Sequence, residues 1–250
     1  MKLLLTNDDG WDADGLGVLR EVASGFGEVW VVAPALPMSG ISHQITFERP
    51  MKLEERAAQI FSLTGTPADC VRIATTQLNV EFDWVLSGIN NGANLGSDIY
   101  VSGTFAATRE AALRGHRSVA LSQHRRKFKA VFDWRRTGEM ATEVLHAILD
   151  GSSEFAQGSA ININFPDRYH ASETQTQNPG SVEIVACPLD PNPLPAEFAA
   201  NENGELVYCS QYNQRPRTDG CDIDVCFGGN ITMTNFRFGQ ASTDKHQLRT

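Results

Sequence analysis

The sequence has no long uninterrupted hydrophobic run. Hydrophobic residues make up 41 % of its 250 residues, yet no apolar stretch approaches the roughly 18 residues of a membrane-spanning helix. Near the N-terminus, residues 3–5 (LLL) are followed at once by Thr6 and Asn7, which is not the pattern of a signal peptide. We therefore expect a soluble, cytoplasmic protein that does not interact with membranes.

Cysteine is scarce and scattered. There are five cysteines, an odd number without the usual spacings of a zinc site. Cys221 and Cys226 form the only close pair in the sequence, and no second pair or histidine stands nearby. This pattern favours ordinary thiols in a reducing compartment.

An excess of positive charge is also missing. The net charge of −9 argues against sequence-independent binding to long nucleic acids. Eight of the 21 basic residues lie between positions 114 and 136. Such a run is typical of a solvated loop and the start of a helix, and attraction of anionic substrates is the second interpretation.

The first two thirds of the chain alternate strand-like and helix-like segments. This alternation predicts an α/β fold with a mostly parallel sheet. Thr66 and Pro67 are residue types that begin a helix, and Thr104 is the predicted cap of a helix running to Gly115. A long polar loop is expected after the second strand. The predicted strands are residues 2–6, 28–33, 83–86, 118–122 and 160–165, and further helical segments are 16–23 and 141–149.

The composition changes after about residue 167. Residues 168–220 are rich in Pro, Asn, Gln and Ser, and residues 229–238 (GNITMTNFRF) alternate like a strand. We interpret residues 1–250 as one domain, with a core at 1–167 and a C-terminal extension of hairpins and loops at 168–250. Because exposed strands pair with other chains, the strand at 229–238 is the predicted contact of a homo-oligomer.

An acidic pair follows the first predicted strand. Asp8 and Asp9 come directly after residues 2–6, so we expect them at the carboxyl edge of the sheet, where α/β folds bind ligands. Two adjacent carboxylates repel each other unless a cation lies between them, and a hard divalent ion such as Mg²⁺ suits them. A simple Asp-Gly turn without a ligand is the alternative.

Other oxygen-bearing side chains also follow predicted strands. Ser39 comes after the second strand and Asn90 after a later one. Carboxylate, hydroxyl and amide oxygens together suit Mg²⁺, Mn²⁺ or Ca²⁺. Residues 91–96 (NGANLG) offer backbone N–H groups, and residues 102–104 (SGT) lie at a predicted helix N-terminus, a favourable place for a phosphate.

Taken in this order, the segments resemble the SurE family of stationary-phase survival proteins, which act as 5′/3′-nucleotidases. The TNDDG motif combined with SGIN-x-G-x-N-x-G is the specific part of the resemblance. The matching stretches are LLLTNDDGWDADGL (3–16), VVAPALPMSG (31–40), LTGTPADCVRIA (63–74), SGINNGANLGSDIYVSGTFAATREA (87–111) and ININFP (161–166).

The resemblance implies a Rossmann-like, three-layer core and hydrolysis of nucleoside 5′- and 3′-monophosphates. It also implies homodimers or homotetramers joined through C-terminal segments. One divalent metal ion per subunit is expected, with the ligands Asp8, Asp9, Ser39 and Asn90. The candidate catalytic residues are Asp8, Asp9, Asn94 and Ser102. The candidate substrate contacts are Ser39, Gly40, His43, Gly103 and Thr104.

Some residues have two interpretations or depart from the family pattern. His43 is either a general acid or phosphate contact, or a histidine with a structural hydrogen bond. Asp69 is expected to stabilise the start of its helix. Ala35 and Met38 stand where the family usually has an acidic and a basic residue. Neither position is a metal ligand in the family, so the metal interpretation is unaffected.

The favoured function is a phosphomonoesterase in which metal-activated water attacks the phosphate and Asp8 or Asp9 accepts its proton. A nucleotide-binding protein of the same fold with little or no turnover is the alternative. A signalling receiver domain needs an aspartate after the third strand, and residues 61–65 have none. Attack by an aspartate is disfavoured, because such families place a second aspartate where this chain has Gly10.

Overall fold

The computed structural model describes residues 1–126, 132–150, 155–167 and 182–238. Its strands are β1 (Lys2–Thr6), β2 (Glu28–Pro34), β3 (Leu53–Ala57), β4 (Ile60–Leu63), β5 (Trp84–Asn90), β6 (Arg117–Gln123), β7 (Ser159–Phe165), β8 (Ile184–Ala186), β9 (Phe198–Ala200), β10 (Leu206–Tyr208) and β11 (Ile231–Arg237). The helices are α1 (Asp14–Ala23), α2 (Pro67–Gln77), α3 (Gly103–Leu113), α4 (Trp134–Asp150) and α5 (Asp222–Phe227), with 3₁₀ turns η1 (Gly96–Tyr100) and η3 (Tyr212–Gln214).

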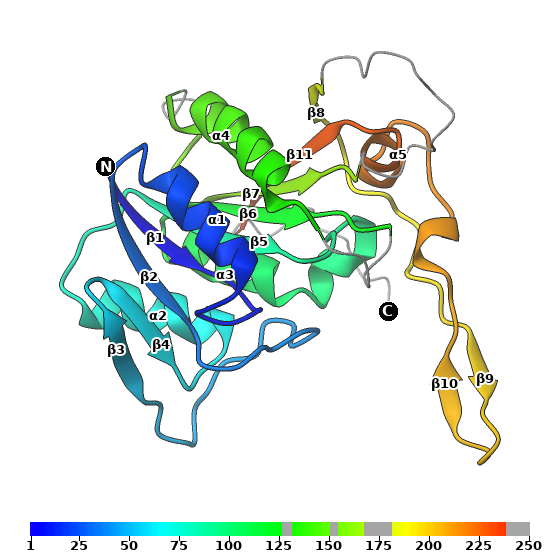
Figure 1. Cartoon of the computed structure of the whole chain (residues 1–250), viewed down its shortest axis with the longest axis horizontal. Helices are drawn as coiled ribbons and strands as arrows, with labels where there is room; N and C mark the ends of the chain where they lie inside the picture. Colours follow the sequence, from blue (N-terminus) through cyan, green and yellow to red (C-terminus); the bar gives the residue numbers. More distant parts are fainter. Residues whose placement is uncertain (127–131, 151–154, 168–181, 239–250) are drawn as a thin grey trace, which may run out of the picture.

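A nine-stranded sheet in the order β3-β4-β2-β1-β5-β6-β7-β11-β8 forms the centre of the molecule. Strands β4, β2, β1, β5, β6 and β7 run parallel to one another. Helices α1 and α4 cover one face of the sheet, and α2 and α3 cover the other (Figure 1). The predicted α/β fold with a mostly parallel sheet is therefore confirmed.

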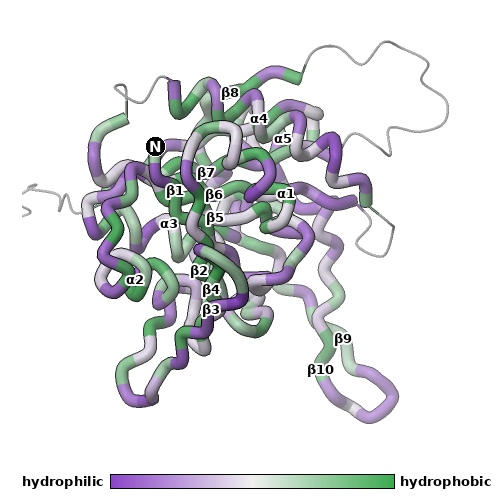
Figure 2. Tube along the Cα trace, turned by 60° about the vertical axis from the view of Figure 1, so that its left-hand side comes forward, coloured by the Kyte–Doolittle hydropathy of each residue, from purple (hydrophilic) through white to green (hydrophobic). Residues whose placement is uncertain are grey.

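The side chains of β1 show why the sheet needs helices on both faces. Leu3 and Leu5 pack into the core beneath α1 and α4, whereas Leu4 packs into the core beneath α2 and α3. All three are fully buried. Successive residues of a strand point to opposite faces, so a continuous apolar run indicates a strand covered on both sides. In Figure 2 the strands at the centre of the molecule carry much of the hydrophobic colour.

The chain order of the sheet places the ends of β1 and β5 side by side. From β1 the chain moves to β2 on one side, and β5 later pairs with β1 on the other side. Open α/β sheets bind ligands in the crevice at such a switch point, outside the carboxyl ends of the strands. Asp8 and Asp9 lie in the segment that follows β1, and Asn90 is the last residue of β5.

Helix α2 begins as predicted. The hydroxyl oxygen of Thr66 accepts a hydrogen bond of 3.1 Å from the backbone N–H of Asp69, and the Asp69 carboxylate accepts one of 3.0 Å from the Thr66 N–H. This reciprocal arrangement satisfies two backbone donors at the helix end. The predicted role of Asp69 is confirmed.

Helix α3 begins two residues earlier than expected. Ser102, and not Thr104, is its cap, because the Ser102 hydroxyl oxygen accepts a hydrogen bond of 3.0 Å from the backbone N–H of Phe105. Thr104 lies inside the helix, and its hydroxyl is free to bind a residue outside it. A cap needs an extended backbone, which Ser102 has.

Two parts of the fold differ from the sequence prediction. Strands β3 and β4 form an antiparallel hairpin in the segment expected to be a polar loop. The C-terminal strand β11 lies inside the sheet, paired with β7 on one side and β8 on the other. β7 thus covers one edge of β11, whereas β8 covers only Ile231, Thr232 and Met233 on the other edge. The contact of this strand with another subunit stays a prediction. Among the described residues, no helix has the length and apolarity needed to cross a membrane.

Candidate metal and phosphate site

A cavity of about 360 Å³ lies at the switch point of the sheet. Its volume falls within the range of roughly 300–1,000 Å³ that is usual for small-molecule sites. Seven of the predicted site residues line this cavity together: Asp8, Asp9, Ser39, Gly40, Asn90, Asn94 and Ser102. The tertiary structure thus brings together residues that are far apart in the sequence.

Asp8 is held at the N-terminus of α3. The carboxylate is 5 % exposed, and its Oδ1 accepts a hydrogen bond of 2.6 Å from the hydroxyl of Thr104. Burial, together with a smaller contribution from the neighbouring charge of Asp9, raises the pKa of Asp8 to about 6, against the lowering effect of the hydrogen bond from the Thr104 hydroxyl. The site therefore holds more negative charge than its protein contacts compensate, and a cation would restore the balance.

Asp9 and Asn90 present oxygen atoms beside Asp8. Oδ2 of Asp9 accepts a hydrogen bond of 3.1 Å from the backbone N–H of Asn91, and burial raises the pKa of Asp9 as well. The side-chain amide nitrogen of Asn90 donates to the carbonyl of Gly92 at 2.8 Å. Because the nitrogen is engaged, the carboxamide oxygen is the atom that Asn90 can offer to a cation.

The donor set fits a hard divalent ion. Among the described residues, no group of three or more His, Cys, Asp or Glu side chains is placed to hold a metal. The cavity instead combines the two carboxylates of Asp8 and Asp9 with the hydroxyl of Ser39 and the amide oxygen of Asn90. An all-oxygen set of this kind suits Mg²⁺, Mn²⁺ or Ca²⁺.

Gly103 allows the helix to approach Asp8 closely. A β-carbon at position 103 would lie 2.7 Å from Cβ and 2.8 Å from Oδ2 of Asp8. Contacts this short are not tolerated without movement of the carboxylate or of the helix. Gly103 is therefore required for the position of Asp8, whereas the sequence suggested only a substrate contact.

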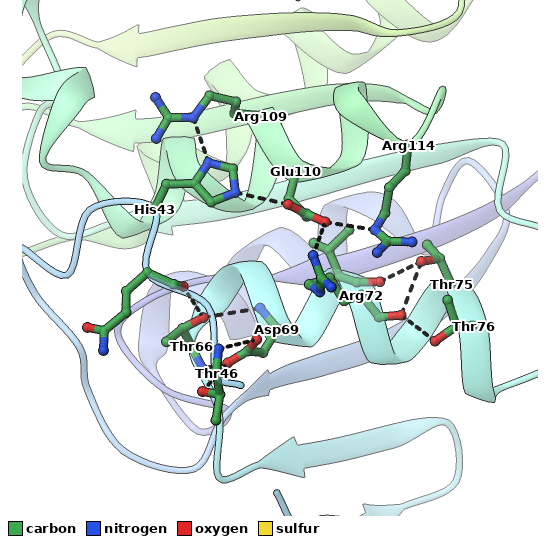
Figure 3. Close-up of polar contacts among 12 residues, drawn as sticks. His43, Thr46, Thr66, Asp69, Arg72, Thr75, Thr76, Arg109, Glu110 and Arg114 are labelled. Atoms are coloured by element: carbon green, nitrogen blue, oxygen red, sulfur yellow. Dashed lines mark hydrogen bonds and ion pairs between the residues drawn. The ribbon is translucent and has the colours of Figure 1, made fainter. Parts of the chain in front are cut away.

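The loop that carries Ser39 is tied to the core at several points. The backbone N–H of Met38 donates to the carbonyl of Asp8 at 2.7 Å. The hydroxyl of Ser42 donates to the carbonyl of Tyr100 at 2.7 Å. Further along the loop, the backbone N–H of Thr46 donates to the carboxylate of Asp69 at 3.0 Å, a contact drawn in Figure 3. These contacts keep Ser39 beside the acidic pair.

His43 belongs to this tethering network and lies outside the cavity lining. Its Nε2 is 3.0 Å from the carboxylate of Glu110, and its Nδ1 accepts a hydrogen bond of 2.7 Å from Nε of Arg109 (Figure 3). Since an arginine can only donate, Nδ1 carries no proton and Nε2–H donates to Glu110. Both ring nitrogens are engaged, which favours the structural interpretation of His43.

Glu110 gathers positive groups around this tether. Burial raises the pKa of its carboxyl group, but hydrogen bonds from His43 and Arg114, with the charges of Arg114 and Arg72, outweigh burial and hold the pKa at about 2. The carboxylate therefore stays charged and bonded throughout the neutral range. Figure 3 shows these partners converging on Glu110 from α2, α3 and the loop.

Asn94 is fixed by two asparagines that the sequence prediction did not single out. Its backbone N–H donates to Oδ1 of Asn164 at 2.8 Å, and its carbonyl accepts from Nδ2 of Asn162 at 2.9 Å. Both partners stand on β7, where the alternation Asn-Ile-Asn placed them on one face. Two buried amides on one face of an apolar strand are the signal that could have identified them.

The C-terminal extension also contributes to the cavity. Leu194, Tyr208 and Tyr212 line it, together with Asp98 of η1. On the core side, Nη1 of Arg125 donates to the side-chain oxygen of Asn91 at 2.5 Å. No local pattern in residues 194–212 indicates that they line the cavity, because their position depends on the path of the chain after β7.

Comparison with known proteins agrees with this geometry. The family model described as "Survival protein SurE" matches residues 3–184. A relative from Nostoc sp. strain PCC 7120, provisionally described as a 5′-nucleotidase, is 44 % identical over 95 % of this chain and 100 % of its own length.

The chain belongs to the SurE family.

Two further comparisons extend this result. The protein named 5′-nucleotidase SurE from Erythrobacter litoralis is 43 % identical over 66 % of both chains. The crystal structure of the SurE protein from Aquifex aeolicus superposes with a TM-score of 0.77 at 26 % identity, covering 96 % of this chain and 95 % of that one. The resemblance inferred from TNDDG and the glycine-rich motif is therefore confirmed for the family and the fold.

Proposed function

We propose that this SurE chain is a metal-dependent phosphomonoesterase that hydrolyses nucleoside 5′-monophosphates to nucleoside and phosphate. The observation that carries the proposal is that the buried Asp8, held at the N-terminus of α3, and the half-buried Asp9 line one cavity. The names of the relatives, which include 5′-nucleotidase SurE, support a nucleotide as the substrate.

One divalent metal ion per subunit would be held by the oxygen atoms of Asp8, Asp9, Ser39 and Asn90. When bound, such an ion neutralises charge on the phosphate and lowers the pKa of a coordinated water. The phosphoryl oxygens would then lie near the start of α3, where the helix dipole favours negative charge. The proposed phosphate contacts are Gly40, Asn94, Ser102, Gly103 and Thr104.

The side chains around the cavity have separate tasks in this proposal. Thr104 keeps one oxygen of Asp8 occupied, so the carboxylate keeps its orientation while Asp8 or Asp9 accepts the proton of the attacking water. An aspartate that is both a ligand and a hydrogen-bond acceptor is a poor nucleophile. Gly10, moreover, leaves the chain without the second acid that aspartyl-phosphate enzymes place there.

Release of phosphate from adenosine 5′-monophosphate, measured with and without a chelator, tests this function. We expect release in the presence of Mg²⁺ or Mn²⁺, loss of release with the chelator, and recovery on addition of excess metal. Binding of the nucleotide without any release would favour the alternative, a binding protein of the same fold. Release that a chelator does not affect would contradict the role of the metal.

A single turnover in ¹⁸O-labelled water tests the chemical route. Direct attack by water places the label in the phosphate during the first turnover. Label in an aspartate side chain would instead establish the covalent route.

Assembly into a homodimer or homotetramer is also part of the proposal. The hairpin of β9 and β10 projects from the body of the molecule (Figures 1 and 2), and Phe198, Leu206 and Val207 on it are exposed. Exposed apolar groups of this kind favour contact with another protein surface. Light scattering that gives the mass of a monomer at working concentration would contradict this part.

A further inference from the structure

The proposed function leaves part of the cavity wall without a role. Asp8, Asp9, Ser39 and Asn90 provide for a metal and a phosphate, but Leu194, Tyr208 and Tyr212 line the same cavity. These side chains offer apolar and aromatic surface and no charge. A phosphate gains nothing from such surface, so another portion of the ligand must lie against it.

Tyr212 is held in a fixed orientation. Its hydroxyl donates a hydrogen bond of 2.7 Å to Oδ2 of Asp98, and Nη1 of Arg215 donates to the same oxygen at 2.6 Å. The guanidinium group of Arg215 also lies 5.1 Å from the centre of the tyrosine ring, and the Phe227 ring is 6.3 Å away. The position of the ring is therefore set before any ligand binds, which lowers the entropic cost of binding.

Tyr208 presents aromatic surface in a similar way. Its hydroxyl donates to the carbonyl of Pro195 at 2.7 Å, and its ring packs edge to face against Phe198 at 5.6 Å. Because both tyrosine hydroxyls are engaged by the protein, the rings offer carbon surface to the cavity. The ligand group that such surface suits best is a flat heteroaromatic ring.

We propose that Tyr212, with Tyr208 and Leu194, forms the subsite for the nucleobase of a nucleoside monophosphate whose phosphate lies at Asp8 and Asp9. This inference rests on the proposed function and adds the residues that distinguish a nucleotide from other phosphate esters. Asp98 and Arg215 are positioning residues, since they act through Tyr212.

Two substrates that differ only in the base test the subsite. Adenosine 5′-monophosphate and ribose 5-phosphate carry the same phosphate and sugar, so only the first can use the tyrosines. Stacking of a base on an aromatic side chain corresponds to roughly a tenfold or larger change in affinity. We therefore expect Tyr212→Ala to raise the KM for the nucleotide about tenfold and to leave the KM for ribose 5-phosphate unchanged.

Further variants separate stacking from a structural role. Tyr212→Phe keeps the ring but loses the hydrogen bond to Asp98, so the KM for the nucleotide is expected to rise less than in Tyr212→Ala. Tyr208→Ala, at a half-exposed position, should act in the same direction as Tyr212→Ala even if the latter folds poorly. Tyr100→Ala is the matched control, because Tyr100 is exposed on η1 and does not line the cavity; both KM values should stay unchanged.

The outcomes distinguish this inference from the proposed function. Equal changes for both substrates in Tyr212→Ala and Tyr208→Ala would overturn the nucleobase subsite. Absence of phosphate release from either substrate by the wild-type protein would overturn the proposed function instead. In that case calorimetric titration with the same two ligands still tests the subsite, which requires tighter binding of the nucleotide and loss of that preference in Tyr212→Ala.

Discussion

Replacement of Asp8 or Asp9 by asparagine is expected to abolish phosphate release while the protein remains folded. Each change removes one of the two negative charges that hold the metal, and affinity for a hard cation depends on the number of carboxylates. Loss of a single electrostatic contribution to the transition state commonly lowers kcat by about 10²–10³. We expect a loss of at least this size, because the metal itself is lost.

The fold should tolerate these substitutions. Asp8 is buried and Asp9 is half-buried beside it, and burial raises the pKa of both carboxyl groups. Removing one charge from such a pair relieves repulsion in the metal-free protein. The melting temperature without metal should therefore be at least that of the wild type. The rise in melting temperature that Mg²⁺ or Mn²⁺ gives to the wild-type protein should disappear, since a ligand stabilises only a protein that binds it.

Asp12→Asn is the matched control for this experiment. It makes the same chemical change a few residues further along the chain, at an exposed position outside the cavity. Its activity and its metal-dependent melting temperature should equal those of the wild type. Near-normal turnover of Asp8→Asn and Asp9→Asn at low metal concentration would remove both residues from the metal site.

Gly103→Ala is expected to inactivate the enzyme through a single methyl group. The added carbon would lie 2.7 Å from Cβ of Asp8 and 3.0 Å from Cγ2 of Ile41. Either Asp8 or the start of α3 must move, and overpacking of this kind destabilises a protein by about 1–3 kcal/mol. Asp8 is then displaced from Ser39, Asp9 and Asn90. Phosphate release should therefore fall by orders of magnitude, which is far more than the added fraction of unfolded protein accounts for.

Gly17→Ala provides the control for the methyl group itself. Gly17 lies in α1, and a β-carbon built there meets nothing within 4 Å. Alanine is favoured over glycine inside a helix by roughly 1 kcal/mol, so this variant should be as stable as the wild type or more so, with full activity. Phosphate release and thermal melting of both variants give the comparison. Full activity in Gly103→Ala would show that Asp8 does not depend on the close approach of α3.

Local patterns in the sequence were enough to identify the core elements and the acidic pair. An apolar run such as residues 3–5 can be buried only in a strand covered on both faces, and a carboxylate that follows such a strand must lie at the edge of the sheet. The pairing of Thr66 with Asp69 was predictable for the same reason, since both partners lie within one helical turn.

Other features depended on contacts between segments that are distant in the sequence. Ser102 and Thr104 are both good cap residues, and only the position of Asp8 against α3 decides that Thr104 binds the carboxylate. From the sequence, His43 could be either a substrate contact or a structural residue. In the structure, both of its ring nitrogens are engaged, one by Glu110 and the other by Arg109.

The aromatic wall of the cavity and the place of the last strand belong to the tertiary structure alone. Tyr212 lies at the cavity because its hydroxyl donates a hydrogen bond to Asp98, a residue more than a hundred positions earlier in the sequence. The alternating pattern of β11 predicts a strand but does not indicate its neighbours, which β7 and β8 supply. Sequence periodicity determines which faces of an element are apolar, whereas the partner of each face is decided by the free energy of packing the whole chain.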